Sequence, residues 1–418
     1  MSSDLCFLTA TELARRIRVR DVSVTEVVQA HLAQVERVNP KVNAIVTLTA
    51  ERALADARAK DAALARGEAA GPLFGLPVAH KDLVPTRGIR TTFGSPIYRD
   101  HVPDQDALLV ERLRAAGAVT IGKTNTPEFG AGSQTFNEVF GRTLNPYDPT
   151  KTCGGSSGGA AVALACGMVP IADGSDTGGS LRNPASFCNV VGMRGAPGRV
   201  PPWPTDTPWS TLHVPGPMAR TVADVALMLS AMAGPDPRSP IAIAEPGDRF
   251  RAPLGRDFKG VRVAWSRDLG GLPVDRRVTA ALDAQRATFD ALGCHVEDGQ
   301  PDFAEARQIF QVLRALNFAT RYGPLLAQRR HQTIHGVHDL SAAAVVQCDL
   351  KKQTGVLRGL FLRVPQLALH ARIEAVDAPD RDEADVVLHQ RGELLPQILL
   401  EQHHQRRYFV ARTLPVLD

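Results

Sequence analysis

Two glycine-rich loops that carry serine, with one lysine upstream of them, are the residues of this sequence best suited to chemistry. The first loop, residues 154–159, holds Ser156, and the second, residues 176–180, ends in Ser180. A serine hydroxyl is a weak nucleophile until a base removes its proton. Lys81 is a candidate for that base. Two serines and one lysine therefore predict acyl transfer from an amide without a catalytic histidine.

Lys81 acts as a base only when its amine is neutral, so the reference pKa of lysine, about 10.4, must fall. Burial away from water lowers the pKa of a lysine. Lys81 follows the apolar run Leu76–Ala79, which predicts a strand that could bury it. His80 directly precedes Lys81 and faces the opposite side of such a strand. We therefore interpret His80 as a packing or hydrogen-bonding histidine.

The glycines of the second loop suit a reacting centre. Glycine permits backbone shapes closed to other residues and lets a substrate approach the main chain. Consecutive N–H groups in such a loop can point at one spot and stabilise an oxyanion. The stretch from Thr177 to Ser180 is suited to that role.

Other residues near the loops are weaker candidates. Lys123 is a rival base, but its turn-like Gly-Lys-Thr-Asn setting favours a structural or surface role. Ser157 is a rival to Ser156 as a relay serine. Cys153 and Cys188 flank the two loops, and nothing in the sequence around them lowers a thiol pKa. We interpret both cysteines as buried and structural.

A group of histidines, His331, His335 and His338, includes the i, i+4 spacing of helical metal sites. Gln332 stands where H-E-x-x-H sites carry their glutamate, and Gly336 weakens the helix. We interpret this segment as a polar, partly solvated helix. Neither a metal nor an organic cofactor is expected.

The elements that must position these residues begin with helices before residue 68. Thr9 and Ser23 each begin a capping box, which satisfies free N–H groups at a helix start. The helix after Ser23 is expected to stop at Asn39-Pro40. Residues 50–66 are rich in Ala, Arg and Glu and predict a further helix.

Beyond residue 68, short apolar runs punctuated by glycine and proline alternate with helical patterns. Strands are predicted at 76–80, 119–122, 169–172 and 261–265, and helices at 107–116, 159–166 and 278–292. This alternation predicts a layered α/β fold.

Composition narrows the class of protein. The 418 residues carry a net charge of only +4, which suggests neither nucleic acid nor an anionic membrane as a partner. Six cysteines without a CxxC pair, no leader-like N-terminus and no long apolar run predict a cytoplasmic protein with reduced thiols. The oligomeric state is left open, with a homodimer as one option.

From about Leu13 to Asp236, the chain resembles the amidase signature family of serine hydrolases. Ser180 follows Ser156 by 24 positions, and Lys81 precedes Ser156 by 75, where the family's lysine falls. Further shared motifs lie at residues 75–82, 122–125, 174–184 and 216–221. The resemblance implies an α/β/α layered fold of the amidase signature type, in which helices cover a mixed sheet and a helical segment comes first.

The resemblance also implies roles for the reactive residues. Ser180 resembles the nucleophile that forms the acyl-enzyme, and Ser156 resembles a bridging serine that follows a cis peptide bond. Lys81 resembles the base that draws the proton of Ser180 through Ser156. The implied reaction is hydrolysis of a small-molecule carboxylic amide to an acid and ammonia or an amine.

Supporting roles within the second loop follow from the same resemblance. The N–H groups of Thr177, Gly178 and Gly179 correspond to oxyanion donors. Asp176 and Arg182 match a pair that braces the loop without taking part in the chemistry.

Two alternatives stay open beside a free-standing amidohydrolase. One is the amidase subunit of a tRNA-dependent amidotransferase, which uses the same chemistry to release ammonia from glutamine for a partner subunit. The other is a catalytically silent relic whose loops persist without a complete pocket. Residues 201–209 are either a wall of an apolar or aromatic acyl pocket or a rigid surface loop.

One amidase-like domain is expected over residues 1–418. It comprises a helical N-terminal segment (1–67), a catalytic core (68–330) and a tail (331–418). Ser175 replaces the threonine that the family usually carries before the aspartate of the second loop. The tail lacks the family's later segments, so we interpret it as divergent, or as the product of a shifted reading frame that shortens the chain.

Overall fold

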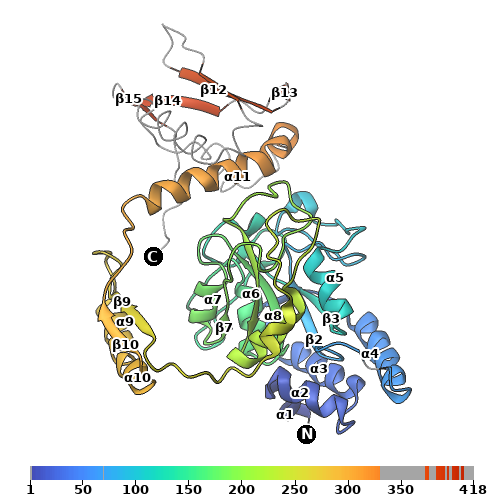
Figure 1. Ribbon diagram of the computed structural model, residues 1–418. Helices are drawn as coiled ribbons and strands as arrows, with labels where there is room; N and C mark the ends of the chain where they lie inside the picture. Colours follow the sequence, from blue (N-terminus) through green and yellow to red (C-terminus); the bar gives the residue numbers. More distant parts are fainter. Residues whose placement is uncertain are drawn as a thin grey trace. The chain divides into compact units, whose positions relative to one another are not determined.

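The computed structural model describes residues 2–68 and 70–329, together with short strands beyond residue 371 (Figure 1). Those strands are β11 (Arg372–Ala375), β12 (Glu383–Gln390), β13 (Glu393–Leu394), β14 (Ile398–His403) and β15 (Arg406–Tyr408). Apart from these strands, the tail expected at 331–418 lies outside the described residues, and so does the histidine group considered for a metal.

The chain divides into two compact units. Unit 1 takes in residues up to Arg251 and resumes at Asn317, and unit 2 comprises Ala252–Leu316. The long helix α11 (Ala306–Arg329) begins in unit 2 and ends in unit 1. None of the described helices, α11 included, combines the length and apolarity needed to cross a membrane.

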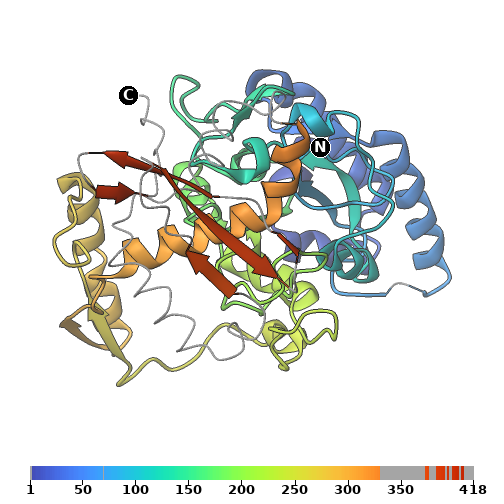
Figure 2. The ribbon, with the colours of Figure 1, turned by 90° about the horizontal axis from the view of Figure 1, so that it is seen from above.

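The N-terminal helices begin where the sequence predicts. α2 (Ala10–Arg18) follows Thr9 and α3 (Val24–Val42) follows Ser23, and each cap hydroxyl accepts an N–H of the first turn. The capping box at Ser23 is complete. Two further helices contact α3: α1 (Ser2–Phe7) and α4 (Ala50–Ala65). The view from above (Figure 2) shows these blue helices gathered on one side of unit 1.

The predicted stop of α3 at Asn39-Pro40 is wrong, because Pro40 lies inside the helix. The helix ends instead at Asn43, whose φ of 53° is left-handed and whose N–H donates to the carbonyl of Asn39. The Asn39 side chain accepts the N–H groups of Ala44 and Ile45, at 2.8 Å each. These contacts give the first residues after the helix their partners, so the chain turns three residues later than expected.

A six-stranded mixed sheet forms the centre of unit 1, with the strand order β1-β3-β2-β6-β8-β7. Its strands are β1 (Ile45–Leu48), β2 (Pro77–Lys81), β3 (Val119–Thr124), β6 (Ile171–Asp176), β7 (Val191–Gly192) and β8 (Val214–Ala219). β2 is parallel to both neighbours, and the other pairs are antiparallel. The predicted mixed sheet is confirmed. β8 was not predicted because its two prolines and one glycine are unusual inside a sheet.

α6 (Gly158–Ala165) packs across this sheet and contacts five of its strands. Every residue from Gly158 to Leu164 is buried, which agrees with a helix that is apolar all round. The remaining elements of unit 1 are α5 (Leu108–Ala115), α7 (Arg182–Phe187), α8 (Val222–Met232), the short helices η1 (Pro96–Tyr98), η2 (Glu128–Gly130) and η3 (Gly247–Arg251), and the strands β4 (Phe136–Asn137) and β5 (Gly141–Arg142).

Unit 2 contains a parallel pair of strands, β9 (Arg262–Trp265) and β10 (His295–Asp298). The single helix predicted between them is two helices, α9 (Arg276–Asp283) and α10 (Arg286–Ala291). The ladder breaks at Gln285, whose N–H donates to a carbonyl three residues back rather than four. A tighter turn therefore separates the two helices.

Gly159→Ala should destabilise unit 1, because α6 approaches neighbouring backbone too closely for a side chain there. An added Cβ would lie 2.3 Å from the Asn125 nitrogen and 2.7 Å from the Ala44 oxygen. Overpacking of this kind costs about 1–3 kcal/mol, so the midpoint of urea unfolding should fall. Gly195→Ala is the control, since its Cβ would approach Arg199 no closer than 3.4 Å. Equal stability of the two variants would contradict the packing argument.

Candidate functional site

Lys81 is the last residue of β2, and its amine is the centre of the polar site. The side chain is fully buried, with 0% exposure. Its Nζ donates to the hydroxyls of Ser156 at 2.7 Å, Ser157 at 2.9 Å and Ser175 at 3.2 Å. The first serine loop, with Ser156 and Ser157, and strand β6, with Ser175, therefore converge on one buried amine. The contact expected between Lys81 and Ser156 is among them.

The charge state of this amine follows from its surroundings. Burial lowers the pKa of Lys81 to about 7, although the carboxylates of Asp173 and Asp176 oppose that shift. An amine with this pKa can release and take up a proton near neutral pH. The expected burial of Lys81 is therefore found.

The first serine loop leads directly into α6. The peptide bond between Gly155 and Ser156 is cis, as the resemblance implies. The hydroxyl of Ser157 also accepts the N–H of Ser175 at 3.3 Å, which ties it to β6. Within the described residues, Ser156 Oγ has the Lys81 amine as its one hydrogen-bond partner. Ser156 Oγ can therefore form a further hydrogen bond with a second hydroxyl group.

Ser180 ends the second loop and is half-buried. Its backbone carbonyl accepts the N–H of Ser157 at 3.1 Å, which joins the two serine loops. In the part of the chain that the structure describes, no hydrogen bond holds the Ser180 hydroxyl. This side chain is therefore available to an incoming group.

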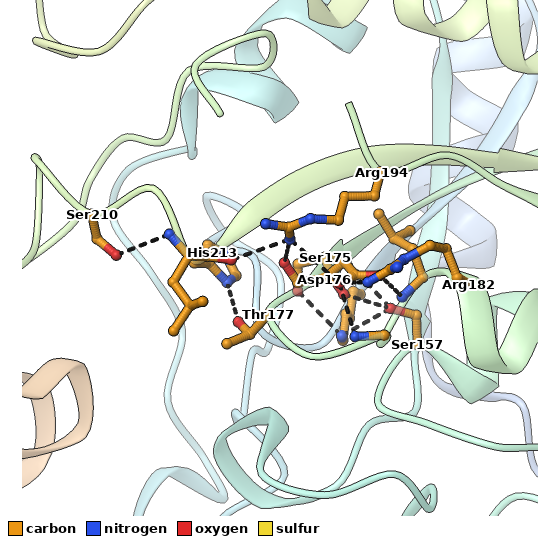
Figure 3. Close-up of polar contacts among 12 residues, drawn as sticks. Ser157, Ser175, Asp176, Thr177, Arg182, Arg194, Ser210 and His213 are labelled. Carbon is orange, nitrogen blue, oxygen red and sulfur yellow. Dashed lines mark hydrogen bonds and ion pairs between the residues drawn. The ribbon is translucent and has the colours of Figure 1, made fainter. Parts of the chain in front are cut away.

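Asp176 holds the second loop in shape. Its carboxylate accepts the N–H groups of Gly179 at 2.9 Å and Leu181 at 3.2 Å. Arg182 donates to both carboxylate oxygens, at 2.9 and 3.0 Å, and Figure 3 shows Arg194 directed at the same residue. Burial raises the pKa of this carboxyl, but the hydrogen bonds from Arg182 and the two N–H groups outweigh it and bring the pKa down to about 2. A permanent negative charge therefore braces the loop.

The expected oxyanion donors differ in availability. The N–H of Gly179 already donates to Asp176 within the loop. Among the described residues, no acceptor is hydrogen-bonded to the N–H groups of Thr177 or Gly178, and Gly178 is exposed. These two groups are therefore the better candidates to stabilise a developing oxyanion.

Arg194 and His213 also belong to the site, although no sequence signal points to them. Arg194 donates to the carbonyl oxygens of Asp176 and, at 3.1 Å, of Leu212, which ties the segment before β8 to the loop. His213 Nδ1 lies 3.4 Å from the hydroxyl of Thr177 (Figure 3). Burial and nearby cations lower the pKa of His213 to about 3, so the ring is neutral at pH 7.

His80 makes hydrogen bonds, as predicted, and does not face the Lys81 amine. Its Nδ1 lies 2.5 Å from a carboxylate oxygen of Asp173, and its Nε2 lies 3.1 Å from the Thr120 hydroxyl. The alternation of side chains along β2 therefore separates two adjacent polar residues.

Lys123 has a structural role, but the alternative of a surface position is wrong. β3 continues to Thr124, so Lys123 lies on a central strand with 0% exposure instead of in a turn. Its amine donates to the carbonyl of Val84 and to the hydroxyls of Thr86 and Thr91. These contacts anchor the segment that follows β2.

Cys153 and Cys188 are both buried, and burial raises the pKa of each thiol. The predicted burial of both cysteines is confirmed. Within residues 2–68 and 70–329, no three His, Cys, Asp or Glu side chains are grouped so that they could hold a metal ion.

An aromatic cluster lies beside the first serine loop. The rings of Phe129 and Tyr322 are 4.5 Å apart, and Phe318 lies 5.3 Å from Tyr322. Gly130 follows Phe129, and a Cβ placed on Gly130 would lie 3.5 Å from Ser156 Oγ. The second half of α11 therefore contributes aromatic side chains to the surroundings of the polar site.

The chain is similar to proteins of one known family over most of its length. A family model described as Amidase matches residues 26–342. A glutamyl-tRNA(Gln) amidotransferase subunit of Methylococcus capsulatus is 43% identical over 290 residues, which are 69% of this chain and 60% of that protein. The corresponding protein of Azotobacter vinelandii is 41% identical over 73% of this chain and 63% of its own length. The chain thus spans about three fifths of these relatives.

Solved structures agree on the fold. A bacterial aryl acylamidase of the amidase signature family superposes with a TM-score of 0.77 and 23% identity, covering 96% of this chain and 93% of its own. A 6-aminohexanoate cyclic dimer hydrolase complexed with substrate gives a TM-score of 0.70 and 30% identity, covering 82% of this chain and 70% of its own. The predicted fold of the amidase signature type is confirmed.

Lys81→Met should make stability less dependent on pH. The unfolded chain holds a lysine proton up to about pH 10.4, whereas the folded chain loses it near pH 7 because the pKa of Lys81 is lowered to about 7. Between these values the unfolded state binds one more proton, so the stability of the unsubstituted protein gains about 1.4 kcal/mol per pH unit from Lys81.

The variant lacks that gain, and its stability relative to the unsubstituted protein should fall steadily in urea unfolding at pH 7, 8 and 9. The exposed Lys151 provides the control. For Lys151→Met, the difference in the free energy of unfolding from the unsubstituted protein should stay constant with pH. A constant difference for Lys81→Met would contradict the lowered pKa.

Proposed function

This chain belongs to the amidase family, and we propose that it hydrolyses carboxylic amides through an acyl-enzyme formed on Ser180. The observation that carries the proposal is the fully buried Lys81 amine, 2.7 Å from the hydroxyl of Ser156. A base of lowered pKa on one serine, with a second and accessible serine on the adjoining loop, is the arrangement that an activated serine nucleophile needs.

In the acylation step, the Ser180 oxygen attacks the amide carbon, its proton passes to Ser156, and the proton of Ser156 passes to Lys81. The carbonyl oxygen becomes an oxyanion, and the N–H groups of Thr177 and Gly178 stabilise it. When the carbon–nitrogen bond breaks, the proton returns by the same route to the leaving nitrogen. The products of this step are an ester on Ser180 and free ammonia or an amine.

Water completes the cycle by attacking the ester. The relay takes a proton from water and returns one to the Ser180 oxygen, so the carboxylic acid leaves and the enzyme is restored. The braced loop around Asp176 keeps its shape through both steps, because a carboxyl whose pKa is about 2 stays ionised. In both steps, each proton that is transferred comes from, and goes to, a residue of this chain, the amide substrate or water.

A second candidate function concerns the identity of the amide. The curated relatives are named as subunits of a glutamyl-tRNA(Gln) amidotransferase, which favours glutamine as the amide and delivery of the ammonia to a partner protein. This candidate has more support among the named relatives than a free-standing hydrolase. The aromatic cluster at Phe129 and Tyr322 instead favours an apolar acyl group. Both candidates use the same relay.

Ser180→Ala should abolish ammonia release from every amide that the unsubstituted protein cleaves, and should abolish covalent labelling by a fluorophosphonate. The amides to be tested are a panel of aliphatic amides, aromatic amides and glutamine. This panel separates a free-standing amide hydrolase from a glutamine-cleaving subunit. Ser239→Ala is the matched control, because the Ser239 hydroxyl is buried with no hydrogen-bond partner among the described residues. Equal rates in the two variants would remove Ser180 as nucleophile. A folded protein that takes no label would support a silent relic.

The pH dependence of kcat/KM should report Lys81. The amine must be neutral to accept a proton, and its pKa is lowered to about 7. Activity should therefore fall about tenfold per pH unit below pH 7 and level off above it. Initial rates between pH 5 and 9 on the best amide of the panel provide the measurement. A rate that is flat from pH 5.5 to 8 would exclude Lys81 as the base.

A further inference from the structure

A buried carboxylate lies directly behind Lys81, and no step proposed above uses it. Asp173 on β6 has 0% exposure, and its Oδ1 accepts the main-chain N–H of Lys81 at 3.0 Å. Its Oδ2 lies 2.5 Å from Nδ1 of the equally buried His80, whose Nε2 lies 3.1 Å from the hydroxyl of Thr120 on β3. The carboxylate of Asp173 thus connects β6 to Lys81 and His80 on β2, and His80 in turn contacts Thr120 on β3.

The positions of the protons follow from these contacts. A carboxylate oxygen accepts, so we assign the donor role to Nδ1 of His80, and with that tautomer Nε2 accepts from the hydroxyl of Thr120. Each oxygen of Asp173 has a donor. A buried carboxylate is tolerated only when it is hydrogen-bonded or paired in this way, so the imidazole fixes the orientation of Asp173.

The carboxylate also acts on the amine through space. Burial disfavours the protonated form of Lys81, and Asp173 is the foremost charge that opposes burial, followed by Asp176 on the same strand. Lys123 on β3 also lies within the influence of Asp173. His213, before β8, is neutral at pH 7 and adds no charge. Asp173 is therefore the main group that keeps the amine basic enough to take a proton.

We propose that Asp173 and His80 are positioning residues of the relay. The carboxylate, held by the imidazole, fixes the backbone of Lys81 and supplies the negative charge that lets its amine accept the Ser180 proton through Ser156. This inference rests on the proposed function, because it gives the pair a task in the same proton transfer. Neither residue touches the reacting atoms.

Asp173→Asn tests the charge. The new amide still accepts the N–H of Lys81, and His80 can change tautomer to accept from the amide, so the buried contacts are kept. Loss of the charge should lower the pKa of Lys81 by about 1 unit or more. NMR titration of lysine Cε resonances, with Lys81 assigned from Lys81→Met, measures that shift without requiring activity. The acid limb of kcat/KM should move to lower pH equally, and the plateau should fall about threefold because the base is weaker.

Two variants of His80 keep the test decisive even if Asp173→Asn fails to fold. His80→Leu leaves Oδ2 of the buried Asp173 without its donor, which disfavours the negative charge there, so the acid limb of kcat/KM should shift in the same direction. His80→Gln restores an N–H donor and should return the acid limb of kcat/KM to its original pH. A merely structural role of His80 would not predict that recovery. Asp224→Asn is the matched control, because this buried carboxylate accepts from Thr11 instead and should leave the Lys81 titration unchanged.

An unchanged pKa of Lys81 in Asp173→Asn and in His80→Leu would overturn the positioning role. A lowered pKa together with a wild-type protein that cleaves no amide would instead overturn the proposed function, and would leave intact the electrostatic control of Lys81 by Asp173. The two failures are therefore distinguishable.

Discussion

A primary amine enclosed by protein is the constraint on which the rest of this structure depends. A buried ammonium without partners is costly, and Lys81 avoids that cost in two ways: three serine hydroxyls accept from its Nζ, and its pKa is lowered to about 7. Those hydroxyls must come from somewhere other than β2. Burial of Lys81 therefore requires that the first serine loop, with Ser156 and Ser157, and strand β6, with Ser175, both lie at the end of β2.

The sheet meets this requirement through the parallel pair β2 and β6. Parallel neighbours end at the same edge, and the carboxyl ends of such strands are where α/β proteins place their ligands. β2 ends in Lys81 and β6 ends in Asp176, so the amine and the second loop meet at one edge. α6 packs across the same strands and brings the first loop to that edge at its N-terminus. Close packing at Gly159, where no Cβ fits, fixes how near that loop approaches.

The parts of this arrangement that could be predicted from sequence are those with local causes. The caps at Thr9 and Ser23 depend on residues three positions apart, and both were predicted. The strand that buries Lys81 follows from its apolar run. β8 and the end of α3 were not predicted, because the partners that stabilise them, a neighbouring strand and the Asn39 side chain, override the local signal of proline. Arg194 and His213 enter the site only through tertiary contacts of the second loop.

The same distinction bears on specificity. The residues of the proposed relay lie on β2 and in the two serine loops, where glycine and buried polar contacts leave little room for change. Aromatic side chains near the relay come instead from η2 and the second half of α11, through Phe129 and Tyr322. Residues that only pack there can change in size and polarity without disturbing the amine or its hydroxyls. Under the proposed function, the choice of amide therefore depends on those outer side chains and not on the residues of the proposed relay.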